Sequence, residues 1–253
     1  MSKTNEMLLA LVIKHKGEWS KIYQSISHKE YAETDNITCD MSYITIMDNE
    51  YPNSLKRQHQ PPFVLFCEGN IDLLKSESKK LAIINSRKAN ETKEKKAISM
   101  LLNQPTDTIY VVSGENPFLN EIVDIAEIQN HKVIVVLPYD FYHFSQQGLK
   151  QRIIANGGLF ITTYPENAFV DLSNNNFIQE KMLIAKLCDK VLVMSCGAKS
   201  SNLVAVMTAL NENKDILVVP TGIEQTDYEN NNLIANGAYC VYNYDTLNYE
   251  LTN

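Results

Sequence analysis

The sequence predicts an α/β fold, a doubly wound and parallel-rich sheet of about six strands with helices on both faces. From Leu81 onward, short apolar runs alternate with amphipathic segments of helix length. The apolar runs show no in–out alternation, which is typical of parallel strands that are buried on both faces. Before Leu81 the pattern of apolar residues differs, with two short helical patterns and a polar stretch.

The expected strands follow one another at regular intervals along the chain. In order they are LAII (81–84), IYVVS (109–113), KVIVVLP (132–138), LFITT (159–163), KVLVMS (190–195) and DILVVP (215–220). Helical patterns separate them: a lysine-rich segment, residues 120–130, Gln146 to Ala155, 177–187 and 201–213. Strand–helix alternation of this kind indicates one parallel sheet.

The region before the sheet carries two expected helices, Asn5 to Lys14 and Glu18 to Ser27. Pro61 and Pro62 are incompatible with a helix interior, so they mark a rigid connection into the expected strand FVLFC. We therefore interpret residues 1–45 as a small helical N-terminal region and residues 46–253 as the main α/β domain.

Composition excludes several classes of protein. The net charge of −7 over 253 residues argues against a protein that coats nucleic acid indiscriminately. The five cysteines show no CxxC pairing, which fits a reducing compartment without structural zinc. No segment approaches the roughly 20 apolar residues of a membrane span, and the N-terminus lacks the pattern of a signal peptide. We expect a cytoplasmic protein with no membrane contact.

The usual catalytic motifs are absent from the sequence. It contains no GxGxxG, GxxxxGK[ST], GxSxG or HExxH, and its five histidines lack metal-ligand spacing. We expect no enzyme activity, no metal and no cofactor.

Four expected strand ends carry residues suited to phosphate: NSRKAN, SGENPF, CGAKSSN and PTG. Ligands of parallel sheets collect at such ends, where helix N-termini present unpaired N–H groups. Arg87 has the planar fork that suits a phosphate, the alternative being an ordinary surface arginine. Gly114 permits a close approach of a ligand or simply a tight turn. Ser200 or Ser201 is placed to cap the following helix, with Lys199 beside it.

Aromatic residues near the strand ends offer a stacking surface for bases. A buried role in packing is the alternative for each one. The candidates are Phe118, Tyr139, Phe141, Tyr142 and Phe144.

Several short motifs follow one another over about residues 40–243: YPNSL with PPFVLFCEGN, LAIINSR, VVSG, GGLFITTYP, FIQEKMLIAKL, KSSNLVAV and NNNLIANGA. Together and in this order they resemble the DprA (Smf) family of bacterial DNA-processing proteins. The resemblance implies an extended Rossmann-like domain, a homodimer, and a basic pocket that holds the backbone of single-stranded DNA. It also implies protection of incoming DNA and help in loading a RecA-type recombinase during natural transformation. The matching positions, which we expect to contact phosphate, are Ser86, Arg87, Lys88, Ser113, Gly114, Lys199, Ser200, Asn231 and Gly237.

The sequence also departs from the family at charged positions. Pro117 stands where the family has an arginine, and Glu180, Lys181 and Met182 replace its Arg-Asn-Arg run. Because affinity for a DNA backbone follows the number of phosphates neutralised, weaker DNA binding or a changed ligand stays open. The alternatives are a Rossmann-like module that binds a nucleotide or nucleotide derivative, as a sensor or hydrolase, and a degenerate interaction partner.

Overall fold

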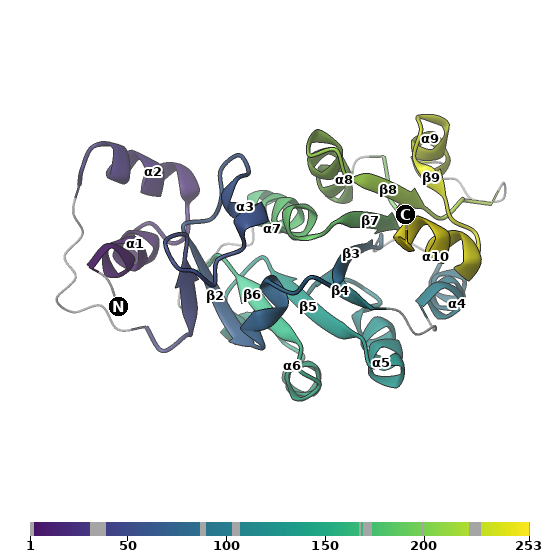
Figure 1. Ribbon diagram of the computed structural model, residues 1–253, viewed down its shortest axis with the longest axis horizontal. Helices are drawn as coiled ribbons and strands as arrows, with labels where there is room; N and C mark the ends of the chain where they lie inside the picture. Colours follow the sequence, from purple (N-terminus) through teal and green to yellow (C-terminus); the bar gives the residue numbers. More distant parts are fainter. Residues whose placement is uncertain are drawn as a thin grey trace.

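The computed structural model describes residues 3–30, 39–86, 90–102, 107–166, 168, 174–198, 200–222 and 229–252. In this part of the chain all strands belong to one nine-stranded sheet, in the order β1-β2-β6-β5-β4-β3-β7-β8-β9 (Figure 1). The strands are β1 (Tyr43–Thr45), β2 (Val64–Gly69), β3 (Lys79–Ile84), β4 (Thr108–Ser113), β5 (Lys132–Leu137), β6 (Leu159–Thr162), β7 (Lys190–Val193), β8 (Asp215–Val218) and β9 (Tyr239–Cys240).

Strands β3 to β9 all pair in parallel, and antiparallel pairing occurs at the edge formed by β1 and β2. Neighbouring strands pair in parallel from β6 through β5, β4, β3, β7 and β8 to β9. Strand β2 pairs antiparallel with β6, and β1 pairs antiparallel with β2. The six strands expected from the apolar runs all lie in this one sheet, which confirms the predicted fold class.

The helices of the described residues connect these strands. They are α1 (Lys3–Lys14), α2 (Trp19–Ser27), α3 (Asn53–Lys56), η1 (Ile71–Leu74), α4 (Glu91–Leu102), α5 (Leu119–Gln129), η2 (Phe141–His143), α6 (Gln147–Ala155), α7 (Asn174–Leu187), α8 (Asn202–Asn211), α9 (Glu229–Ala235) and α10 (Tyr244–Thr252). The seven expected helices are all present. Among the helices described, none combines the length and the apolar character that crossing a membrane requires.

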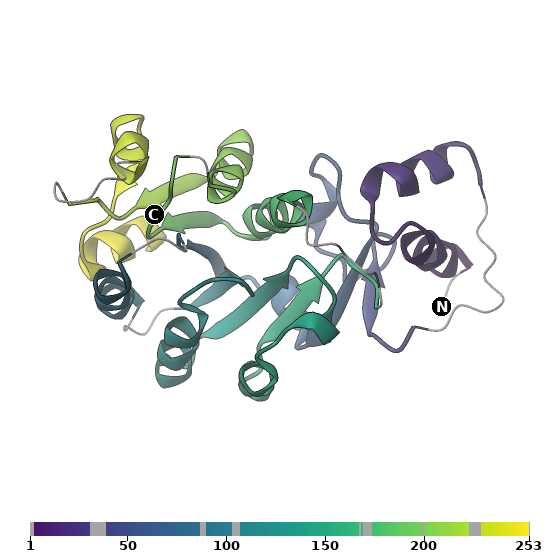
Figure 2. The same ribbon diagram turned by 180° about the vertical axis from the view of Figure 1, so that it is seen from behind.

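Both faces of the sheet are covered, because successive side chains of each strand point to opposite faces. Leu81 and Ile83 of β3 join a core with residues of α1, α2, α4, α5, α6 and α10. Ala82 and Ile84 join a second core with residues of α3, α7 and α8. In both views α4, α5 and α6 lie on one side of the sheet and α7 and α8 on the other, with α1 and α2 at the end beside β2 (Figures 1 and 2).

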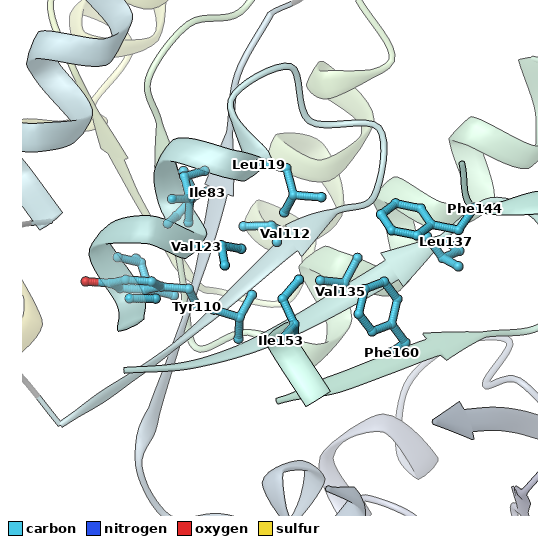
Figure 3. Packing of buried hydrophobic residues seen from close by; sticks show 14 of the residues in the cluster. Ile83, Tyr110, Val112, Leu119, Val123, Val135, Leu137, Phe144, Ile153 and Phe160 are labelled. Carbon is cyan, nitrogen blue, oxygen red and sulfur yellow. The ribbon is translucent and has the colours of Figure 1, made fainter. Parts of the chain in front are cut away.

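The first core is densely filled around α5. Ile83, Val112 and Val135 come from three neighbouring strands and share this core with Leu119 and Val123 of α5 (Figure 3). At its far side the rings of Phe144 and Phe160 lie 5.3 Å apart, and both side chains are almost fully buried. Burial on this scale, at about 25 cal/mol per Å² of apolar surface, is the main force that holds helices and sheet together.

The N-terminal helices pack on the same core as the sheet. Leu11 of α1 and Ile22 of α2 belong to the core that also contains Phe66 of β2. The amide of Asn5 donates to the carboxylate of Asp48 over 2.6 Å, which ties α1 to the loop after β1. The predicted boundary at residue 45 coincides with the last residue of β1, and the division into two domains stays a prediction.

Candidate functional site

A pocket of about 740 Å³ lies at the carboxyl ends of β3, β4 and β7. We call it the strand-end pocket; Asn85 and Ser86 after β3, Asn116 after β4 and the residues that begin α8 line it, with α7 as a further wall. The strand order reverses at β3, since β4, β5 and β6 extend to one side and β7, β8 and β9 to the other. Open α/β sheets bind ligands at such a reversal, and the volume is in the usual range for ligand sites.

Three asparagines hold the rim of the strand-end pocket in place. The amide of Asn116 donates to the carbonyl oxygen of Ile83 over 3.3 Å and to the side-chain oxygen of Asn85 over 3.1 Å. The amide of Asn202, at the start of α8, donates to the backbone carbonyl of Asn85 over 2.9 Å. The ends of β3 and β4 and the start of α8 are therefore fastened together before any ligand binds.

Glu94 of α4 extends this polar network behind the rim. Its carboxylate accepts a hydrogen bond of 2.8 Å from the amide of Asn85. Burial raises the pKa of Glu94, although hydrogen bonds from Ser195 and Asn85 oppose the shift. Ser195 also accepts the backbone N–H of Ser86 over 2.9 Å, so Ser86 is oriented by the segment that follows β7.

The strand-end pocket has an acidic group beneath it. Glu180 of α7 is 2% exposed, and its carboxylate accepts a hydrogen bond from the hydroxyl of Ser113. The ammonium of Lys181 lies 3.1 Å from the other oxygen of that carboxylate. Burial raises the pKa of Glu180, and Lys181 and Ser113 oppose that shift without reversing it.

The charge at this site is therefore modest. Lys181 is the one cation among the described residues that line the strand-end pocket, and Glu180 partners it. The pocket is also lined by Glu115, which accepts a hydrogen bond of 2.6 Å from the hydroxyl of Tyr139. Additional positive charge must come from the adjoining segments if an anion is to bind strongly.

The predicted phosphate contacts fall into three groups. Ser86, Ser113 and Ser200 line the strand-end pocket. The hydroxyl of Ser113 is engaged, because it donates to Glu180 and accepts the N–H of Glu115. Of the two expected caps of α8, Ser201 stands at the N-cap position without a side-chain hydrogen bond, whereas the hydroxyl of Ser200 accepts the N–H of Asn202 over 3.1 Å.

Arg87, Lys88 and Lys199 form the second group and lie outside the described residues. Along the chain they adjoin lining residues: Arg87 and Lys88 follow Ser86, and Lys199 stands between Ala198 and Ser200.

The third group comprises Gly114, Asn231 and Gly237, which are not among the lining residues. A Cβ on Gly114 would lie 2.2 Å from Cδ2 of Leu137, so this glycine permits close packing of β4 on β5. The side chain of Asn231 pairs with both the N–H and the carbonyl of Thr221, each over 2.9 Å. Gly237 has a φ of +104° and ends α9, with the N–H of Ala238 donating to Leu233. This is the glycine-terminated helix end known as a Schellman motif.

The expected aromatic platform is mostly buried. Phe118, Tyr139, Phe141 and Phe144 are each at most 6% exposed, whereas Tyr142 is 82% exposed. Packing is thus the role of four of the five candidates. Phe177 of α7 is the aromatic residue among the described lining residues of the strand-end pocket.

Sequence reasoning missed Asn116, Asn202 and the Ser113–Glu180–Lys181 cluster. Asn116 and Asn202 follow strand ends, which is a signal, but their hydrogen bonds span 31 and 117 residues. Glu180 looks like a solvent-facing helix residue in the sequence. Among the residues that the structure describes, no group of three or more His, Cys, Asp or Glu side chains is placed to hold a metal ion.

Comparison with known proteins gives relatives that are described as DNA-processing proteins. The DNA processing protein DprA of Streptococcus pneumoniae is 26% identical over 182 residues, which cover 71% of this chain and 63% of that protein. Protein Smf of Borreliella burgdorferi is 27% identical over 173 residues, which cover 66% of this chain and 54% of that protein. The chain thus matches less than two thirds of the length of these relatives.

Two solved structures share the fold. The X-ray structure of DprA from Streptococcus pneumoniae superposes with a TM-score of 0.78 at 19% identity and covers 99% of each chain. DNA processing protein A of Helicobacter pylori, described as binding single-stranded DNA in a unique mode, superposes with a TM-score of 0.70 at 21% identity. That match covers 85% of this chain and 98% of the other.

A profile of the family described as DNA recombination-mediator protein A matches residues 42–252. The match covers most of the chain and confirms the resemblance carried by the sequence motifs. The protein therefore belongs to the DNA recombination-mediator protein A family, also called DprA or Smf.

Proposed function

We propose that the protein binds single-stranded DNA in the strand-end pocket. One observation carries the proposal: three cationic residues adjoin lining residues of this pocket in the sequence. Arg87 and Lys88 follow Ser86, and Lys199 precedes Ser200. The Helicobacter pylori protein of the same fold, described as a binder of single-stranded DNA, supports this choice of ligand.

Recognition of the DNA would depend on the backbone of the strand. Hydrogen bonds already fasten the ends of β3 and β4 to the start of α8, so this part of the rim does not have to be ordered on binding, which lowers the entropic cost. Arginine and lysine next to that rim supply charged hydrogen bonds to phosphates. Binding of this type is independent of base sequence and weakens as salt rises.

In the cell we propose a role in DNA processing, in which the protein protects incoming single strands and assists a RecA-type recombinase to load. Family membership supports this role. Its test is the rate at which a recombinase assembles on DNA that is already coated, measured with and without this protein.

A nucleotide or a nucleotide derivative is the second candidate ligand. The pairing of Lys181 with Glu180 favours it, because a pocket with little free positive charge suits a small ligand with one phosphate better than a polyanion. A volume of about 740 Å³ accommodates such a molecule.

Fluorescence anisotropy with labelled oligo-dT at roughly 50 and 200 mM salt, beside a thermal-shift panel of nucleotides, separates these ligands. For DNA we expect binding that weakens steeply between the two salt concentrations. Stabilisation by a mononucleotide together with no oligo-dT binding would instead select the second candidate. Absence of both responses would leave the role of an interaction partner.

A further inference from the structure

A second cleft, of about 780 Å³, lies on the opposite side of α7 from the strand-end pocket. We call it the N-terminal cleft; the turn from Lys14 to Ile22 between α1 and α2 forms one wall, the loop before β2 forms another, and α7 forms the third. Helix α7 stands between the N-terminal helices and the β7–α8 part of the molecule in both views (Figures 1 and 2).

Helix α7 gives one face to each cavity. Asn175, Gln179 and Lys186 line the N-terminal cleft, whereas Phe177 and Lys181 line the strand-end pocket. These positions are spaced as the two sides of one helix require. One helix with its side chains is about 10–12 Å across, so the two cavities are close neighbours.

Positive charge dominates the N-terminal cleft. Lys14, Lys16, Lys21 and Lys186 line it, and Glu18 is its acidic lining residue among those described. Glu18 is already paired with Lys21 over 2.6 Å. Within the described part of the chain, Lys14 and Lys16 are exposed and form no ion pair.

Lys186 is a fixed cation at the base of the N-terminal cleft. It is 5% exposed, and its ammonium donates to the backbone carbonyls of His59 over 2.6 Å and Gln60 over 3.3 Å. Burial lowers the pKa of Lys186, and the nearby carboxylate of Glu212 opposes that shift. The exposed Lys14 and Lys16 are therefore the main cations that attract anions to this cleft.

Aromatic rings lie beside these cations. The ring of Trp19 stacks on Phe63 with centroids 5.5 Å apart and on Tyr23 with centroids 5.0 Å apart. The indole N–H donates to the carbonyl of Pro61 over 2.8 Å, which fixes the orientation of the stack. Trp19 and Phe63 line the cleft, whereas Tyr23 does not line it and is 52% exposed, so another ring can stack on Tyr23 beside the cleft.

Cations beside a preformed aromatic stack are the combination that binds single-stranded nucleic acid, through phosphates and bases respectively. The strand-end pocket offers Phe177 as its aromatic lining residue, so the two cavities complement each other. We propose that the N-terminal cleft is a second subsite for the same DNA strand, which passes the α7 wall from one cavity to the other. This proposal rests on the proposed function of the strand-end pocket.

Trp19 is the single tryptophan of the chain, so its fluorescence reports on the N-terminal cleft. Single-strand-binding modules occupy roughly 4–16 nucleotides, so oligo-dT of about 6 nucleotides lies near the lower end of that range and oligo-dT of about 20 exceeds it. We expect both oligonucleotides to bind by anisotropy. Only the longer one should quench Trp19, and thymidine monophosphate should not.

The matched variants are Lys14→Gln/Lys16→Gln and, as a control, Lys3→Gln/Lys75→Gln. Both lose two exposed lysines, but Lys3 and Lys75 line neither cavity. Glutamine keeps a long unbranched side chain at Lys16, where φ is +52°. For the longer oligonucleotide we expect the affinity of the first variant to fall roughly tenfold. The slope of log affinity against log salt concentration should decrease by about 1.4, which is about 0.7 for each of two lost phosphate contacts. Its affinity for the shorter oligonucleotide, and both affinities of the control, should stay within about twofold of the wild type.

Binding of the longer oligonucleotide without quenching of Trp19 and without an effect of Lys14→Gln/Lys16→Gln would overturn the N-terminal cleft as a subsite and leave the proposed function intact. Quenching by thymidine monophosphate alone would replace the strand path by a separate nucleotide site. If neither oligonucleotide binds, the proposed function fails, and this inference fails with it.

Discussion

Glu180 and Lys181 show how a single pair of side chains sets the charge of the strand-end pocket. Neighbouring residues of one helix normally point in different directions, yet the ammonium of Lys181 lies 3.1 Å from the carboxylate of Glu180. Ser113 donates to the same carboxylate. A buried carboxylate needs such partners, because desolvation of an unpaired charge costs several kcal/mol.

Lys181→Met should lower the free energy of unfolding by about 3–5 kcal/mol at neutral pH, since it leaves Glu180 buried and without its cation. The pKa of Glu180 is already raised by burial. As the pH falls through that raised pKa, the folded protein takes up a proton that the unfolded chain does not bind until nearer 4.5. The deficit should therefore shrink toward acidic pH, which urea denaturation at several pH values measures.

The control for this prediction is Glu180→Gln/Lys181→Met, which removes both charges. Its stability relative to the wild type should not recover toward acidic pH as that of Lys181→Met does. Equal pH dependence in the two variants would contradict the assigned ion pair.

Arg87→Ala should weaken the binding of oligo-dT by roughly ten- to a hundredfold at fixed salt, because a charged bidentate hydrogen bond to phosphate contributes about 1.5–3 kcal/mol. The salt slope should fall by about 0.7, the value for one phosphate contact on a single strand. We expect the larger loss, since Lys181 is engaged by Glu180 and few cations share the phosphate contacts.

Arg57→Ala is the matched control for Arg87→Ala, because Arg57 is exposed and lines neither cavity. It should bind oligo-dT as the wild type does. Unaltered affinity and salt slope in a folded Arg87→Ala protein would remove the main support for DNA as the ligand of the strand-end pocket.

The turn after β4 shows why one glycine is required between two elements. Gly114 donates its N–H to the carbonyl of Val136 over 2.8 Å, which brings the end of β4 against β5. A Cβ there would lie 2.2 Å from Cδ2 of Leu137, far inside van der Waals contact. This glycine positions the pocket wall from behind and does not line the pocket.

Gly114→Ala should lower the free energy of unfolding by roughly 1–3 kcal/mol, the usual cost of overpacking a filled core. Leu137→Val removes the clashing Cδ2 atom, so the double variant Gly114→Ala/Leu137→Val should lose less than the sum of the two single changes. Chemical denaturation of the four proteins measures this coupling. Strict additivity would show that the two side chains do not meet.

Charge is unevenly distributed over the molecule. No lysine or arginine follows Lys214, and the C-terminal segment with β9 and α10 carries acidic residues. Tyr242 and Tyr249 of this segment are 63% and 66% exposed. A DNA backbone is repelled from such a surface, so we place the C-terminal segment outside the DNA path.

A photoreactive amino acid in place of Tyr249 should therefore give little crosslinking to bound oligo-dT. The same amino acid in place of Phe177, which lines the strand-end pocket, should crosslink efficiently. Strong crosslinking from position 249 would show that the DNA runs over the C-terminal segment.

We also expect a homodimer, for which the family resemblance is the support. Light scattering at micromolar concentration should give about twice the chain mass of 28.7 kDa. A monomeric mass over the whole concentration range would refute this expectation.

Strands β3 to β8 and the seven expected helices followed from local pattern, whereas α3, α9 and α10 were not predicted. Strands β3 to β8 were predicted from apolar runs without alternation, because a strand that is buried on both faces consists almost entirely of apolar residues. The connecting helices were predicted from apolar residues that recur with the period of a helix. The N-terminal helices were predicted from the same kind of period. Strands β1 and β9, of three and two residues, are too short to show any period.

The strand ends at which the pocket forms were also predicted, since parallel strands present their carboxyl ends at one edge of the sheet. Ser86, Ser113 and Ser200 all line that pocket. That Arg87, Lys88 and Lys199 contact phosphate at the same edge stays a prediction.

Which residues contact each other over long distances in the sequence depended on how the elements pack. Asn202 reaches Asn85 across 117 positions and Ser113 reaches Glu180 across 67, distances over which no local period operates. Gly114 has its neighbour Leu137 on another strand, and α7 divides two cavities because it packs on one face of the sheet. Local sequence determines which way each side chain points within its element, whereas hydrogen bonds, clashes and cavities depend on which elements the common core brings into contact.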